Sequence, residues 1–171
     1  MTRWRMVAVA TALALSACSR GPSATSIDKT FVADMAPHHA LGVRMADLAL
    51  AQAEDVRVRE FGFTMGRYQK TEFDHLNHLA TVWKATPSSH IHGMLTADEE
   101  KALAALSGAE FDRAWLTEMI RHHEGAVTMA ATEADAGTNA EAKAIAASVV
   151  EVQTKEITKM KATLASLEPA R

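Results

Sequence analysis

An internal repeat is the feature that most constrains how this chain can fold. When residues 35–72 of the 171-residue sequence are aligned with residues 119–156, at an offset of 84 residues, eight identities appear without a gap. They are concentrated at methionine, histidine, glutamine and glutamate. The identical pairs are Met35/Met119, His38/His122, His39/His123, Val43/Val127, Met45/Met129, Ala46/Ala130, Gln69/Gln153 and Glu72/Glu156. This pattern indicates duplication of a structural unit.

Each unit has the composition and periodicity of two helices. Alanine, leucine, methionine, glutamate and lysine are abundant and alternating β-branched runs are rare, which favours helix over strand. Helical patterning covers residues 28–52 and 55–84 in the first unit, and 109–136 and 139–167 in the second. Two helical hairpins with short connections fold most simply as an antiparallel four-helix bundle. The sequence therefore predicts an all-α protein.

The expected domain organisation follows from this repeat. Residues 1–17 are a signal peptide, residues 18–27 a flexible tether and residues 28–168 the bundle domain. Within the domain, repeat one covers 28–85, a linker with a short helix covers 86–108, and repeat two covers 109–168. Capping-box spacing predicts helix starts at Thr96/Glu99, Ser107/Glu110 and Thr138/Glu141. Pro37 is awkward inside a helix, so the first helix is expected to begin nearer Asp34 or to bend.

The N-terminus carries an export signal. Basic residues in Met1–Arg5 precede an apolar run, Met6–Leu15, that is too short to span a bilayer as a helix. Leu15-Ser16-Ala17-Cys18 resembles the lipobox of bacterial lipoproteins, which implies cleavage before Cys18 and lipidation of that cysteine. The alternatives are an ordinary cleavage site beside a small buried cysteine, or an uncleaved anchor. The expected location is the periplasmic face of a bacterial membrane.

Cleavage also sets the charge and the available ligands. Removing residues 1–17 removes Arg3 and Arg5, which leaves 16 basic and 21 acidic residues and a net charge of −5. This balance argues against nucleic acid or an anionic membrane surface as the main partner, so membrane contact is expected through the lipid anchor only. Because Cys18 is the only cysteine, the lipidated chain has no thiol for a disulfide or a metal site.

The repeated histidines and methionines share one helix face. At 100° per residue, Met35, His38, His39 and Met45 fall within an arc of about 120°, and their counterparts in repeat two do the same. A bundle helix turns such a face inward, because it holds the methionines and small residues.

The partner helices show a matching irregularity, in which polar residues interrupt apolar stripes. These residues are Gln69, Glu72, Gln153 and Glu156. A carboxylate in such a place costs several kcal/mol unless it finds a charge or hydrogen-bond donors, and the inward histidines are the nearest donors. In one interpretation the glutamates hold ring N–H groups of metal-ligating histidines. In the other they form salt bridges with protonated histidines and no metal is needed.

The joint occurrence of histidine and methionine favours a metal site. Imidazole and thioether without thiolate is the ligand mixture expected for copper, with thioether favouring Cu(I) and Cu(II) a second option. The candidate ligands are Met35, His38, His39, Met45, Met119, His122, His123 and Met129. The loop sequence "HIHGM" offers an additional site through His90, His92 and Met94, or is simply a solvated loop anchored by its methionine.

These motifs resemble domain-of-unknown-function family 305. The resemblance is carried by the two M-x-x-H-H-x-x-x-V-x-M-A motifs, the Q-x-x-E motifs downstream, and the H-G-M-L-T segment before "FDRAWLTEMIRHHEGAV", over about Phe31 to Leu167. It implies a ferritin-like four-helix bundle that is exported in bacteria and associated with copper binding and tolerance. The first copy is the less typical one, because Leu76 stands where the second has Met160.

The favoured function is therefore a lipid-anchored copper-binding protein that sequesters or carries the ion, with an unidentified delivery partner and no enzymatic activity. One alternative is a ferritin-like di-metal oxidase, but only Glu72-Phe73-Asp74-His75 has the Glu-x-x-His spacing that such centres use twice. Another is a non-metal helical interaction module whose histidines are structural.

Overall fold

The computed structural model describes residues 23–167. Five helices follow one another: α1 (Ser26–Gln52), α2 (Val56–Trp83), α3 (Ala97–Ala104), α4 (Gly108–Ala136) and α5 (Ala140–Leu167). This part of the chain contains no strand, and the predicted all-α bundle is confirmed. The expected signal peptide and residues 18–22 of the expected tether, including Cys18, lie outside the described residues, whereas Ser26 and Ile27 of that tether belong to α1.

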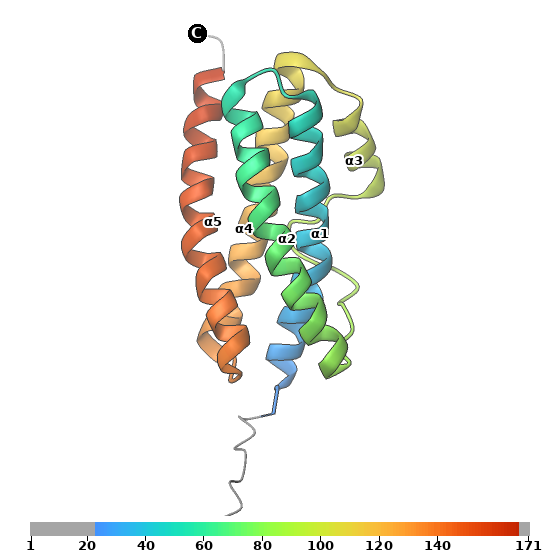
Figure 1. Cartoon of the computed structure of the whole chain (residues 1–171), viewed down its shortest axis with the longest axis vertical. Coiled ribbons are helices and arrows are strands. Elements are labelled where there is room, and N and C mark those ends of the chain that lie inside the picture. Colours follow the sequence, from blue (N-terminus) through green and yellow to red (C-terminus); the bar gives the residue numbers. More distant parts are fainter. Residues whose placement is uncertain (1–22, 168–171) are drawn as a thin grey trace, which may run out of the picture.

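The four long helices form two antiparallel hairpins (Figure 1). Helix α1 packs along α2, α4 packs along α5, and α1 and α4 join the two hairpins. The short helix α3 lies on the outside of the bundle, beside α1 in the view of Figure 1. No helix among residues 23–167 is long and apolar enough to span a membrane.

Helix starts agree with the sequence in part. Thr96 and Glu99 form the predicted capping box at the start of α3. The capping box predicted at Ser107 is wrong, because that side chain makes no capping hydrogen bond. Asn139, one residue beyond the predicted Thr138, caps α5: its Oδ1 accepts from the backbone N–H groups of Glu141 and Ala142 at 3.0 and 3.1 Å.

Helix α1 begins earlier than Pro37 suggested. A capping box of Thr25 and Asp28 starts it at Ser26, so the alternative start near Asp34 is wrong. Pro37 lies inside this helix, which continues to Gln52 although proline has no N–H to donate to the preceding turn. The T-x-x-D spacing at residues 25–28 is a signal that the sequence analysis missed.

Two buried aspartates tie each hairpin to the other. Asp28 on α1 accepts hydrogen bonds from the backbone N–H groups of Thr138 and Asn139 at 2.8 and 2.9 Å, in the α4–α5 connection. Asp112 on α4 accepts from those of Glu54 and Asp55 at 3.2 and 2.7 Å, in the α1–α2 connection. The two aspartates and the two connections are both related by the 84-residue offset. The repeat is therefore visible as a reciprocal clamp at the two ends of the bundle.

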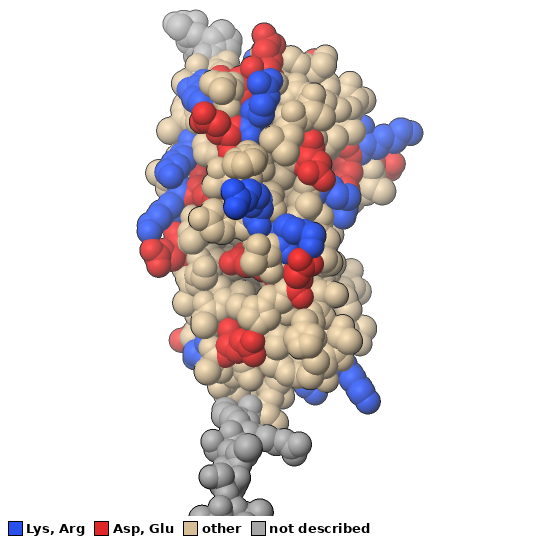
Figure 2. Space-filling model, in the orientation of Figure 1, with Lys and Arg blue, Asp and Glu red and all other residues tan. Residues whose placement is uncertain are grey.

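Two apolar clusters fill the bundle core. One is built around Leu41, Met45, Phe111, Trp115 and Met119, and the other around Phe31, Met35, Leu76, Ala126 and Val149. The paired histidines lie between the residues of these clusters along α1 and α4. On the outside, basic and acidic side chains are interspersed over the face formed by α2 and α5 (Figure 2).

Candidate metal centre

The two repeats bring His38 and His122 face to face. Both side chains are fully buried, and their rings stack with centroids 3.7 Å apart and planes inclined by 11°. His39 and His123 lie on either side, with centroids 6.1 and 6.0 Å from the neighbouring histidine of the same helix. We call these four buried rings the histidine layer.

The outer two rings each contact a glutamate. Nε2 of His39 lies 2.8 Å from Oε2 of Glu72, and Nε2 of His123 lies 3.0 Å from Oε2 of Glu156. The glutamates keep some contact with solvent, with side-chain exposures of 25% and 14%. A carboxylate accepts a hydrogen bond from a nitrogen that carries a hydrogen. This contact therefore holds the hydrogen on Nε2 and leaves Nδ1 of a neutral ring with its lone pair.

Several ring nitrogens of the histidine layer have no hydrogen-bond partner within residues 23–167. They are both nitrogens of His38 and the Nδ1 atoms of His39, His122 and His123. Buried polar atoms are nearly always paired, so a group of unpaired ones needs an explanation. Imidazole nitrogens with available lone pairs fit the ligands that a copper ion takes.

Burial keeps the central pair neutral. It lowers the pKa of His38 well below the ordinary value for histidine, and the neighbouring His39 and His123 lower it further. The pKa of His122 is lowered in the same way, first by burial and then by the surrounding histidines. Neutral rings keep the lone pairs that metal binding uses.

The glutamines differ between the repeats. Oε1 of Gln69 lies 3.4 Å from Nε2 of His122, in space that exists because residue 42 is glycine: a Cβ there would overlap Gln69 Oε1. The repeat counterpart of Gly42 is Ala126. Oε1 of Gln153 has no hydrogen-bond partner among the described residues. The two halves of the site are therefore related by the repeat without being identical.

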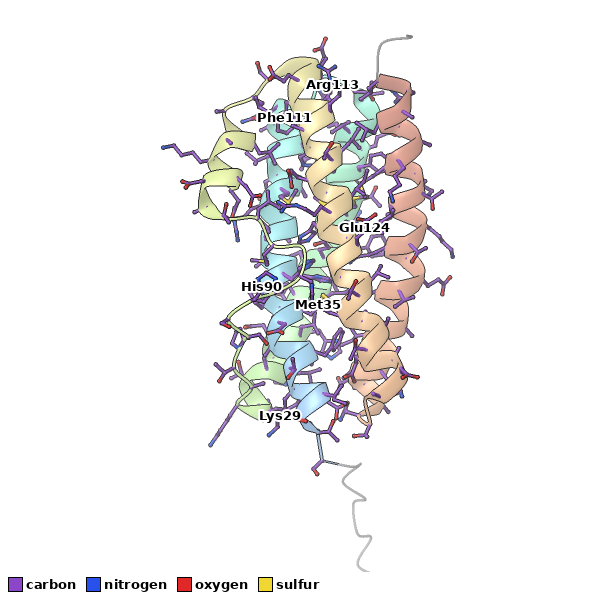
Figure 3. All side chains as sticks on the ribbon, turned by 180° about the vertical axis from the view of Figure 1, so that it is seen from behind. Lys29, Met35, His90, Phe111, Arg113 and Glu124 are labelled. Atoms are coloured by element: carbon purple, nitrogen blue, oxygen red, sulfur yellow. The ribbon has the colours of Figure 1, made fainter. Side chains whose placement is uncertain are left out.

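The predicted methionines flank the histidine layer. Met35, Met45 and Met119 are almost fully buried, and Met129 is partly exposed. Figure 3 shows Met35 turned toward the interior of the bundle. Within residues 23–167, no three His, Asp or Glu side chains form a ready-made metal site.

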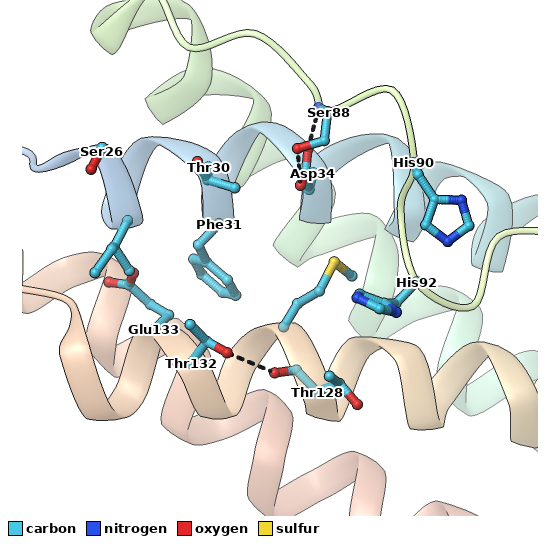
Figure 4. A pocket seen from close by; sticks show the side chains of 12 residues that line it. Ser26, Thr30, Phe31, Asp34, Ser88, His90, His92, Thr128, Thr132 and Glu133 are labelled. Atoms are coloured by element: carbon cyan, nitrogen blue, oxygen red, sulfur yellow. Dashed lines mark hydrogen bonds between the residues drawn. The ribbon is translucent and has the colours of Figure 1, made fainter.

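The loop histidines lie beside a pocket rather than in the core. His90 and His92 line a cavity of about 360 Å³ together with Asp34 and Met129 (Figure 4). Met94 packs instead against the apolar cluster around Trp115. The structure therefore places Met129, and not Met94, with the two loop histidines.

Close backbone contact attaches this loop to the bundle. Ser88 donates to Asp34 through its N–H and its hydroxyl at 2.6 and 2.8 Å. A Cβ at Gly125 would lie 2.4 Å from the carbonyl oxygen of His92, and Gly93 itself has a φ of 75°. Neither glycine was predicted to lie at this contact, although an isolated glycine inside a helical pattern, such as Gly125, is a signal for a close approach.

Comparison with known proteins identifies the family. The model of the family described as "Domain of unknown function (DUF305)" matches residues 28–164. The chain belongs to the DUF305 family. No curated protein sequence matches it.

Solved DUF305 structures have the same fold. One from Streptomyces coelicolor, described as a secreted protein, is 29% identical with a TM-score of 0.76, covering 82% of this chain and 92% of its own. A DUF305 fragment from Deinococcus radiodurans is 28% identical with a TM-score of 0.75, covering 85% and 99%.

CopM in its Cu(I)-bound form is also similar. It is 26% identical with a TM-score of 0.72, and the match covers 83% of this chain and 98% of CopM. CopM has also been solved with Cu(II) and with silver bound.

Proposed function

We propose that this DUF305 protein is an exported, lipid-anchored copper-binding protein that sequesters or carries copper without catalysing a reaction. The observation that carries the proposal is the histidine layer, in which buried, stacked rings carry nitrogens without partners and methionines lie on both sides, three of them buried and Met129 partly exposed. The copper-bound forms of the similar protein CopM support the choice of ion.

The ligand chemistry favours Cu(I). Nitrogen from His38, His39, His122 and His123 and sulfur from Met35, Met45, Met119 and Met129 are the available donors, and thioether favours the lower oxidation state. Glu72 and Glu156 would hold the outer rings with Nδ1 available for the ion, which is a positioning role. His90 and His92, with Met129 behind them, would capture the ion at the surface.

A non-metal role for the histidines is the main competitor. The contacts of His39 with Glu72 and of His123 with Glu156 would also stabilise a bundle that binds nothing. The oxidase alternative has less support, because His75, the histidine of its single Glu-x-x-His motif, contacts Glu141 at 2.6 Å with both side chains about half exposed.

A competition titration separates the two roles. The full chain carrying Cys18→Ser, so that its only thiol takes no copper, is titrated with Cu(I) without oxygen against a chromophoric chelator. Saturable binding is expected, and the copper held by the histidine layer is lost when all four layer histidines are changed to alanine while helical circular dichroism persists. The matched control is His75→Ala/His78→Ala, which removes two exposed histidines of α2.

Two results would decide against copper at this site. Failure of the wild-type chain to compete with the chelator at any ratio would show that the protein does not bind Cu(I). Unchanged copper binding in the four-histidine variant would show that copper binds at other residues. Lipidation of Cys18 is tested separately, by comparing the membrane association and mass of the exported wild-type chain with those of Cys18→Ser.

A further inference from the structure

The structure fixes the relative heights of the four long helices. His38 of α1 stacks on His122 of α4. Closer to the α1–α2 connection, the Trp115 indole N–H donates to the carbonyl of Met45 at 2.7 Å. The contacts of His39 with Glu72 and of His123 with Glu156 place α2 and α5 at the same level. We call the half between the histidine layer and the α1–α2 connection the upper half, as it is drawn in Figure 1.

One methionine from each long helix lies in the upper half. With a rise of about 1.5 Å per residue, Met119 and Met160 lie about 5 Å above the histidine layer, and Met45 and Met65 about 10 Å above it. Their exposures are 1% or less, and all belong to the same packed cluster. We call Met45, Met65, Met119 and Met160 the methionine quartet.

The lower half provides an internal comparison. The 84-residue offset relates the quartet to Met129, Val149, Met35 and Leu76, in that order. These four residues belong to, or pack against, the other apolar cluster, and Leu76 and Val149 are as deeply buried as Met160 and Met65. Valine and leucine therefore fill the equivalent places, so core packing alone does not require methionine there.

Unbranched, polarisable methionine adds a soft ligand that valine and leucine lack. The repeat contributes two thioethers to each half, and the departures from the repeat at Met65 and Met160 both add sulfur to the upper half. From this convergence we propose that the methionine quartet is a second metal site, made of thioethers alone, that takes a monovalent soft ion such as Cu(I) or Ag(I). The choice of cargo rests on the proposed function.

A groove lies on the surface of this half. A cavity of about 470 Å³ lies between α2 and α5 and is lined by Phe61, Thr64, Glu156 and Thr163, among others. Glu156 connects it with the histidine layer through His123. Because thioethers carry no titratable proton, occupation of the quartet is expected to be independent of pH, unlike that of imidazole ligands.

The test exchanges residues between the two halves. In the full chain with Cys18→Ser, Met65→Val/Met160→Leu gives the upper half the residues of the lower half. This variant is expected to bind one Cu(I) equivalent fewer than the parent, and to lose the sulfur-only component of copper-edge X-ray absorption. Met94→Leu is the matched control, because Met94 packs against the same cluster without belonging to the quartet.

The reciprocal variant covers the case in which the first does not fold. Leu76→Met/Val149→Met completes a four-methionine set in the lower half and is expected to gain one Cu(I) equivalent with sulfur ligation. An unchanged copper count and sulfur signal in Met65→Val/Met160→Leu would overturn the quartet site while leaving the histidine site intact. Sulfur-only binding that survives in the four-histidine variant would support the quartet even if the histidine layer binds nothing.

Discussion

At the scale of single residues, the two halves of the histidine layer differ through one methyl group. Gly42 leaves space for the Gln69 amide to reach His122, whereas its counterpart Ala126 carries a fully buried methyl group. The repeat made it predictable that Gln69 and Glu72 would lie near histidines. It did not predict that Gln69 would contact the histidine of the other repeat, because that depends on how the hairpins pack.

Gly42→Ala tests this contact. The new Cβ would overlap Gln69 Oε1 and lie 2.8 Å from Nε2 of His122, so the amide must move. We expect a loss of about 1–3 kcal/mol in the free energy of unfolding, measured with urea. Helix propensity alone predicts a gain of about 1 kcal/mol, so increased stability would contradict the packing argument. Ala126→Gly is the control and should cost about 1 kcal/mol through propensity.

Glu133 gives the protein a pH-dependent stability. This fully buried residue lies near Asp28, and burial first, then Asp28, raises its pKa from the ordinary 4.5 to about 8. The unfolded chain loses this proton near pH 4.5, whereas the folded chain keeps it until about pH 8. The contribution of Glu133 to the free energy of unfolding is therefore highest below pH 4.5 and falls until about pH 8. Asp28 contributes in the opposite sense at lower pH: burial alone would raise its pKa, but hydrogen bonds from Thr25, Asn139 and Thr138 lower it well below the ordinary range.

Glu133→Gln removes the titrating group. We expect it to match the wild-type protein near pH 4 and to be the more stable of the two at pH 8 to 9, with urea unfolding measured across this range. Glu110→Gln, on the exposed start of α4, is the control. Parallel pH profiles for Glu133→Gln and the wild-type protein would show that Glu133 ionises normally in the folded chain.

At the scale of helices and connections, the reciprocal clamps of Asp28 and Asp112 join the hairpins. Each accepts two backbone N–H groups from the connection of the other hairpin. Helical periodicity placed the four long helices within two residues of their observed ends. Helical periodicity did not predict the clamps, because it does not show which distant N–H groups a buried aspartate accepts from.

Replacing the clamps should destabilise the bundle unequally. Asp112→Ala leaves the N–H groups of Glu54 and Asp55 without their acceptor, at an expected cost of about 2–3 kcal/mol. Asp28→Ala should cost more, because Asp28 also accepts from Thr25 in the capping box of α1. Urea unfolding of both variants measures the order. Equal costs would contradict the added contribution of the capping box, and a cost below about 0.5 kcal/mol for either variant would show that water replaces the lost acceptor.

At the scale of the whole molecule, duplication explains why the site is central. Antiparallel hairpins related by the repeat bring His38 and His122 together at α1 and α4, the helices that join the two hairpins. The repeat predicted the bundle and the participating residue types. The loop of His90 and His92 lies outside the repeat and has no periodicity, so its approach to Gly125 could not be predicted in the same way.

The partnerless nitrogens of the histidine layer are the proposed copper ligands. The most direct measurement is ¹⁵N NMR of the histidine side chains during addition of Ag(I), a diamagnetic substitute for Cu(I), to the full chain with Cys18→Ser. We predict large shifts of ring nitrogens in His38, His39, His122 and His123, and none in the exposed His75 and His78. Shifts confined to exposed histidines, with the four buried rings unchanged at saturation, would show that the histidine layer does not bind the ion.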